Sequence, residues 1–99
     1  MFFASIFGTK YWSLNGEFHR ANGPAVEFAD GEKWWYLNGK RHRVDGHAIE
    51  YANGNKWWFL NDILHRENGP AIEQVGGNKW WYLNGIEYPE SAYWKRLRK

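Results

Sequence analysis

The sequence predicts an all-β protein: an elongated antiparallel meander of tandem β-hairpin repeats that ends in a short helical cap. Two observations predict this fold. Near-identical text recurs every 23 residues, and each copy places two turn signals between short runs of residues that favour strands. Of the 99 residues, 20% are aromatic, which excludes a disordered chain. The absence of cysteine excludes disulfide scaffolds and thiolate chemistry.

The repeat defines the organisation of a single domain. Each copy opens with a lysine, at Lys10, Lys33, Lys56 and Lys79. The full copies share the pattern K-x-W-x-L-N-x-x-x-H-R-x-x-G-x-A-x-E-x-x-x-G-x. Gly8 falls in register with the last glycine of this pattern, so the first residues read as the tail of a preceding copy. The predicted parts are an N-terminal half-repeat (1–9), full repeats (10–32, 33–55 and 56–78), a C-terminal half-repeat (79–88) and a helical cap (89–99).

Each copy carries two turns. The first is Asn-Gly after the aromatic run, as in Asn38-Gly39, and this dipeptide is the strongest short signal for a β-hairpin. The third copy has Asn61-Asp62 there, a poorer turn sequence. The second turn ends on glycine, as in Asn53-Gly54. Between the two turns, His-Arg and the following Gly-Pro-Ala predict an irregular connection, because proline cannot donate to a strand ladder.

Strand alternation divides the aromatic residues between two faces. Trp35 and Leu37 point one way, and Trp34 and Tyr36 point the other. The positions of Trp35 and Leu37 keep the same residue in every copy, so we expect that face to form a continuous core. The other face is aromatic but variable, and we expect it to be available to a partner.

The two ends differ in character. Pro89 and Glu90 come early in the last segment and basic residues come late, which is the polarity of a short helix. We consider two roles for it: a cap over the final repeat, or a basic arm that contacts acidic surfaces. At the other end, Met1-Phe7 is apolar and uncharged. An edge strand of that kind needs cover, either by folding back or by a second chain, so the sequence predicts a possible homodimer.

The recurring polar residues predict a structural brace. It consists of His19, Arg20, Glu27, His42, Glu50, His65, Arg66 and Glu73. Two strands per repeat separate equivalent residues by roughly 10 Å, which is too far for shared metal ligands. We therefore expect no metal and no cofactor. No serine has the setting of a nucleophile elbow and no glycine-rich loop matches a phosphate site, so we expect no catalytic residues and no enzyme.

A family resemblance rests on the second copy, with Asn38-Gly39-Lys40-Arg41-His42 and Tyr51-Ala52-Asn53-Gly54. Over roughly residues 8–88 the chain resembles MORN (membrane occupation and recognition nexus) repeats. Arginine stands where that family has Gly-x-Gly, and this HR-x-x-GPA variant is similar to repeats in small proteins of bacteriophages and large DNA viruses. The resemblance implies a twisted antiparallel sheet of hairpins and a role in binding rather than catalysis.

These observations lead to the hypothesis of a non-catalytic protein that binds another protein through its aromatic sheet face. The resemblance adds the expectation of a phage-type inhibitor that blocks a host defence or regulatory protein, located in the cytoplasm. The alternatives are a nucleotide or single-stranded nucleic-acid binder, in which aromatic rings stack on bases, and a structural assembly module. The expected partner-binding residues are Trp34, Tyr36, Trp57, Phe59, Trp80, Tyr82, Lys40, Arg41, Arg43 and His47.

Overall fold

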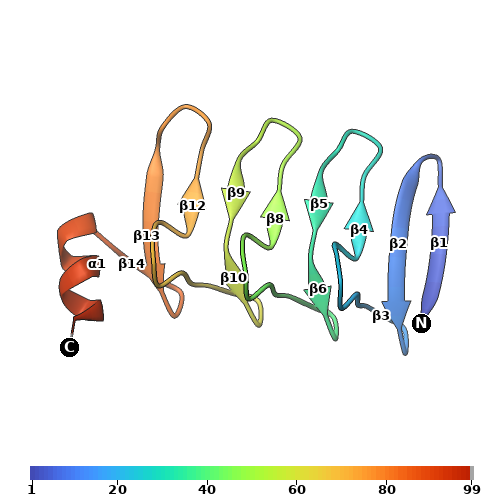
Figure 1. Ribbon diagram of the computed structural model, residues 1–99, viewed down its shortest axis with the longest axis horizontal. Coiled ribbons are helices and arrows are strands. Elements are labelled where there is room, and N and C mark those ends of the chain that lie inside the picture. The colour runs from blue at the N-terminus through green and yellow to red at the C-terminus, as the bar shows by residue number, and fades with distance from the viewer. Residues whose placement is uncertain (99) are drawn as a thin grey trace.

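The computed structural model describes residues 1–98 and shows an elongated row of strands that ends in one helix (Figure 1). Its principal extents are 44 × 29 × 17 Å. The strands are β1 (Phe2–Ile6), β2 (Thr9–Leu14), β3 (Glu17–Phe18), β4 (Val26–Glu27), β5 (Lys33–Trp34), β6 (Tyr36–Leu37), β7 (Lys40–Arg41), β8 (Ile49–Glu50), β9 (Lys56–Trp57), β10 (Phe59–Leu60), β11 (Ile63–Leu64), β12 (Ile72–Glu73), β13 (Lys79–Leu83) and β14 (Ile86–Tyr88), and the helix is α1 (Glu90–Leu97).

The main sheet follows the chain order, β1-β2-β4-β5-β8-β9-β12-β13-β14, and its neighbouring strands are antiparallel. The prediction of an elongated all-β meander with a C-terminal helix is therefore confirmed. The short hairpins β6–β7 and β10–β11 extend from the main sheet at the Asn-Gly and Asn-Asp turns.

A backbone pattern joins each repeat to the next. The N–H of Trp35 donates to the carbonyl of Ala48 (2.7 Å), and the N–H of Ala48 donates to the carbonyl of Trp57 (2.8 Å). The equivalent bonds form around Ala25 and Ala71. Each alanine thus directly precedes a short strand that lies between two tryptophan-bearing strands, one of its own repeat and one of the next.

The backbone conformation of the hairpin turns explains the Asn-Gly and Asn-Asp sequences found at these positions. Asn38 and Gly39 have φ values of 50° and 79°, the left-handed pair that a tight hairpin needs. In the third copy Asn61 and Asp62 adopt the same conformation, at 50° and 67°. The Asp62 carboxylate accepts hydrogen bonds from the backbone N–H (2.8 Å) and the Nε–H (2.7 Å) of Arg41, which compensates for the loss of glycine.

The first nine residues differ from the predicted half-repeat. In the full repeats Val26 pairs with Trp34, whereas β1 pairs Phe3 with Trp12, so the register is shifted by one residue. The reason is a tighter turn at Phe7 and Gly8, where both φ values are positive. Because side chains alternate along a strand, the shift places Phe3 on the ring of Trp12, with 4.9 Å between ring centroids.

The predicted core was wrong for the tryptophans. All eight are half-buried, and so are Leu14, Leu37 and Leu60. The most buried residues of the repeats are Ala25, Ala48 and Ala71, each 0% exposed, with Val26, Ile49 and Ile72 beside them. The physical reason is that the sheet is a single layer, which leaves one side of the tryptophan rings open to solvent. Leu83 is an exception on the predicted face, because α1 lies over its end of the sheet.

Charged residues alternate across the sheet. The pairing register places Lys33 opposite Glu50, and Glu50 opposite Lys56. The same alternation continues in both directions, with Lys10 opposite Glu27 and Glu73 opposite Lys79. Opposite charges at paired positions stabilise this register and disfavour a slip that would bring like charges together.

Replacing Ala48 by leucine tests the position of the core. We expect the Ala48→Leu variant to lose about 1–3 kcal/mol of unfolding free energy, because no space exists for the larger side chain between the two neighbouring strands. Ala52→Leu is the matched control, since Ala52 lies exposed in a hairpin loop of the same repeat. Chemical denaturation measures both variants, and equal midpoints would contradict the assignment of the core.

Candidate functional site

The arginine of each His-Arg pair lies on the invariant tryptophan. The guanidinium carbons of Arg20, Arg43 and Arg66 lie 3.7, 4.1 and 3.8 Å from the ring centroids of Trp12, Trp35 and Trp58. Each guanidinium also donates to a carbonyl four residues along the chain, at 3.2, 3.1 and 3.0 Å. A cation on an aromatic face is attracted by the ring quadrupole, so the arginine holds its loop against the sheet.

The histidines make a separate contact. The Nδ1 atoms of His19, His42 and His65 accept hydrogen bonds from backbone N–H groups of the next repeat, at 3.0, 2.9 and 2.9 Å. The donors are Asn38, Asn61 and Asn84, the first residues of the hairpin turns. The ring proton therefore resides on Nε2. The predicted brace consists of two parts, with arginine and glutamate inside a repeat and histidine between repeats.

The second repeat differs at His47, which stands where the other copies have proline. Arg20 pairs with Glu27 (3.2 Å) and Arg66 pairs with Glu73 (3.0 Å). Glu50, the equivalent carboxylate, instead accepts from His47 Nε2 at 2.7 Å, and within residues 1–98 Arg43 forms no ion pair.

The His47 ring lies edge-on between Trp35 and Trp58, at centroid distances of 5.7 and 5.5 Å. Burial lowers the pKa of His47 and outweighs the attraction of the Glu50 carboxylate. The hydrogen bond from His47 in turn lowers the pKa of Glu50. A neutral imidazole that donates to a carboxylate accounts for both directions.

The stability of the chain should therefore depend on pH through His47. The unfolded chain protonates this ring near its ordinary pKa of about 6.5, whereas the folded chain protonates it only at lower pH. Stability is accordingly lost as the pH falls below that value. We expect His47→Pro to remove this loss, because proline occupies the equivalent positions 24 and 70.

Denaturation of both proteins between pH 7 and pH 5 measures this difference, and the three other histidines cancel in the comparison. Parallel stability curves for the two proteins would contradict the role of His47.

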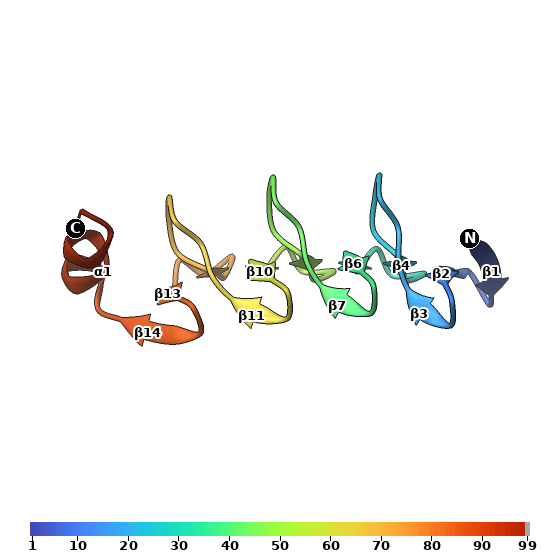
Figure 2. The ribbon, with the colours of Figure 1, turned by 90° about the horizontal axis from the view of Figure 1, so that it is seen from below.

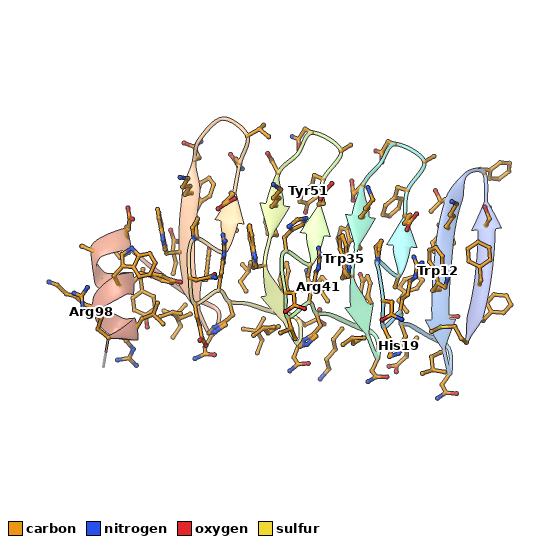
Figure 3. All side chains as sticks on the ribbon, in the orientation of Figure 1. Trp12, His19, Trp35, Arg41, Tyr51 and Arg98 are labelled. Carbon is orange, nitrogen blue, oxygen red and sulfur yellow. The ribbon has the colours of Figure 1, made fainter. Side chains whose placement is uncertain are left out.

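The opposite face carries a continuous row of aromatic rings, which we call the aromatic stripe. Successive rings lie 5.9, 5.3, 6.2, 6.4 and 6.0 Å apart. In order of contact they are Tyr11, Phe18, Tyr36, Trp34, Tyr51 and Trp57. The stripe crosses the first three repeats, and all of its members except the exposed Phe18 are half-buried. Figure 3 shows side chains recurring at the same height in successive repeats, with Tyr51 and His19 near opposite ends of the strands.

The structure separates the predicted partner-binding residues. Trp34, Tyr36 and Trp57 lie on the aromatic stripe, and Trp80 and Tyr82 lie half-buried on β13. Phe59 was a wrong prediction, because it is 4% exposed and packs with Ala48 and Ile49.

The basic residues that were predicted to bind a partner also lie in different places. Arg41 lies over the Phe59 ring at 4.1 Å and pairs with Asp62, and Lys40 is exposed. Arg43 and His47 contact Trp35, so they lie on the face opposite to the stripe and do not join it.

Sequence analysis did not assign Tyr11, Phe18 or Tyr51 to a site. Tyr51 was difficult to predict as a site residue, because the residues at the same position of the first and third copies are Phe28 and Gln74. It lies two residues after Ile49, and this alternation was the available signal. Arg43 and His47 of the second connecting loop were predicted as site residues, but the grooves between the loops were not predicted.

Three loops project to one side of the sheet, and α1 lies on that side beside the third loop (Figure 2). They follow β3, β7 and β11. A groove of about 570 Å³ lies between the first and second loops and contains Trp35 and Leu37. A groove of about 900 Å³ lies between the second and third loops and contains the equivalent Trp58 and Leu60.

No group of metal-ligating side chains is found within residues 1–98, and no helix in that part of the chain is long and apolar enough to cross a membrane. Comparisons with protein families, with curated proteins and with solved structures find no match for this chain. The two faces are therefore interpreted from their own chemistry.

Proposed function

We propose that the chain is a non-catalytic protein-binding module and that the aromatic stripe contacts its partner. The observation that carries this proposal is the unbroken series of ring contacts across three repeats on one face. Tyrosine and tryptophan are the residues that most often dominate the binding energy of protein interfaces. They offer large contact areas while little side-chain freedom is lost. The resemblance to MORN repeats supports the same class of function and is the basis for the idea that binding blocks a host protein.

The polar groups around the stripe favour a protein over a nucleic acid. A single-stranded nucleic acid needs cations beside the aromatic rings to meet phosphates. Arg41 is the cross-strand partner of Tyr36 in the stripe, and it already pairs with Asp62 at 2.7 Å and covers Phe59. Trp34 donates its Nε1–H to Glu32, which adds a carboxylate to the same surface. These internal pairings leave little positive charge on the stripe.

The repeats supply substitutions that the fold tolerates. The first copy has Ser13 where the second has Tyr36, and the third copy has Gln74 where the second has Tyr51. We expect the double variant Tyr36→Ser and Tyr51→Gln to bind its partner at least tenfold more weakly, because two rings are removed from the centre of the stripe. Asn22→Asp is the control, since Asn22 lies exposed in the first connecting loop and the second copy has Asp45 at that position. Capture from a lysate identifies the partner, and titration calorimetry compares the three proteins.

Equal affinity of the double variant and the original chain would contradict the role of the stripe. Random single-stranded DNA serves as a second ligand. Tight binding of that DNA that weakens steeply with salt would establish the nucleic-acid alternative instead, because phosphate contacts release counterions.

We also propose that a second copy of the chain pairs with the open edge of β1. The backbone N–H and C=O of Trp12 bond to Ala25 and His19, so they do not bond to Phe3, its partner on β1. In an antiparallel pair this leaves the backbone groups of Phe3 and Ser5 directed outward. The strand is uncharged and exposes Phe2, Phe3 and Ile6 at 66%, 51% and 56%.

A two-fold axis at Ala4 would place Phe2 opposite Ile6 of the second copy without opposing any charges. Light scattering at micromolar concentration tests this pairing, and we expect a mass above the 11.8 kDa of one chain. Ser5→Glu adds a charge at the open edge, opposite Lys10 within the chain, and should return the mass to that of a monomer. Ser91→Glu, on the exposed start of α1, is the control. A mass of 11.8 kDa for the original chain at every concentration would overturn the pairing.

A further inference from the structure

The loop face contains a binding site whose occupant is visible in another repeat. Tyr93 of α1 is 0% exposed and inserts beside the third loop. Its hydroxyl donates to the carbonyl of Arg66 and accepts from the N–H of Gly69 at 3.2 Å. Its ring lies against Trp81 at a centroid distance of 6.5 Å. The phenol thus joins the backbone of one loop to the tryptophan of the following repeat.

The fourth copy explains why Tyr93 occupies this position. Where the full copies have His-Arg, the fourth has Tyr88-Pro89. Trp81 therefore has no arginine of its own repeat to lie over it, and the helix covers it instead. Leu83 beneath the helix is 7% exposed, whereas the equivalent Leu60 and Leu37 are only half-buried.

The second loop repeats the same backbone groups without an occupant. The equivalents of the Arg66 carbonyl and the Gly69 N–H are the Arg43 carbonyl and the Gly46 N–H, one repeat earlier. Neither group has a hydrogen-bond partner in the part of the chain that the structure describes, residues 1–98. The second loop is also an open bend like the third, while the first loop forms a turn at Ala21 and Asn22.

The surrounding residues are equivalent in part, because Arg66 already lies 3.8 Å from the Trp58 ring centroid and His47 lies at the edge of that ring, whereas Trp81 has no such arginine. The groove of about 900 Å³ contains Trp58 and Leu60, the equivalents of Trp81 and Leu83. It also contains Arg66, whose guanidinium lies on the Trp58 ring and bonds to the Pro70 carbonyl and to Glu73, so a ligand ring enters beside this contact. The neighbouring loops are one repeat apart, roughly 10 Å, which is too close for a whole helix to enter. A single aromatic side chain fits.

We propose that this groove binds a tyrosine side chain of a partner protein. The phenol hydroxyl donates to the Arg43 carbonyl and accepts from the Gly46 N–H, and the ring lies beside Trp58 and Leu60. The partner backbone lies across the projecting loops. This site is on the face opposite to the aromatic stripe, so the test of this site is independent of the test of the function proposed for the stripe.

The test uses 4-methylphenol, which is the tyrosine side chain, and toluene, which is the phenylalanine side chain. In ¹⁵N-labelled full-length chain, we expect 4-methylphenol to shift the amide signal of Gly46 in a saturable manner. Toluene should bind about tenfold more weakly, because it leaves the two backbone groups without partners, at about 1–1.5 kcal/mol. The Gly69 amide reports whether Tyr93 is displaced, and the indole signals report binding at the stripe.

Two variants locate the response. Val44 is 77% exposed and lines the groove, so Val44→Trp should fill it and abolish the Gly46 shift. Val75 is 68% exposed and lies outside the groove, so Val75→Trp should leave the shift unchanged. Equal binding of 4-methylphenol and toluene would overturn the proposal. So would shifts confined to Gly69 or to the stripe indoles, or a Gly46 shift that persists in Val44→Trp.

Discussion

In a sheet one layer thick, no second layer of structure covers the tryptophan rings. In this chain an arginine side chain covers the ring in each full repeat. Each full repeat lays a guanidinium on its invariant tryptophan at about 4 Å and fixes the same guanidinium to a loop carbonyl. The contact covers the indole and holds the loop. The glycine of each loop is part of it, because a Cβ atom at Gly69 would lie 2.9 Å from the guanidinium carbon of Arg66. The two grooves lie between loops that this contact holds against the sheet. The helix α1 covers Trp81, the tryptophan whose repeat lacks the arginine.

Departures from the repeat show where the chain uses this scaffold differently. His47 removes Glu50 from Arg43 and inserts between two tryptophans, where burial lowers its pKa, and this is the basis for the expected pH dependence of stability. In the fourth copy the loss of the arginine leaves Trp81 to be covered by α1. The basic C-terminal residues Lys95, Arg96 and Arg98 stay exposed while Tyr93 is buried. The segment therefore caps the final repeat and keeps its cations in solvent.

The sequence was sufficient for the fold because the fold is local. A fixed period with two turn signals per copy determines a meander, and each copy pairs only with its neighbours. The core could not be deduced in the same way. The positions of Trp35 and Leu37 do not vary because they serve the arginine contact and the loop grooves, not because they are fully buried. Sequence identity between copies marks a shared role without saying whether that role is burial. The register shift in β1 was also hidden, because Gly8 keeps the repeat spacing while Phe7 tightens the turn.

The candidate sites were less predictable because they depend on contacts between repeats. Tyr51 joins the stripe through Trp34 and Trp57, one from its own repeat and one from the next. The groove beside Gly46 likewise lies between the second and third repeats. His42 bonds to the turn of the third repeat, so the same two repeats are already coupled through their backbone. In a linear array, stability is the sum of repeat and interface terms. A ligand that joins the loop of one repeat to the tryptophan of the next would therefore add to this interface term, through the kind of contacts that Tyr93 makes to the third loop and Trp81 at the end of the array.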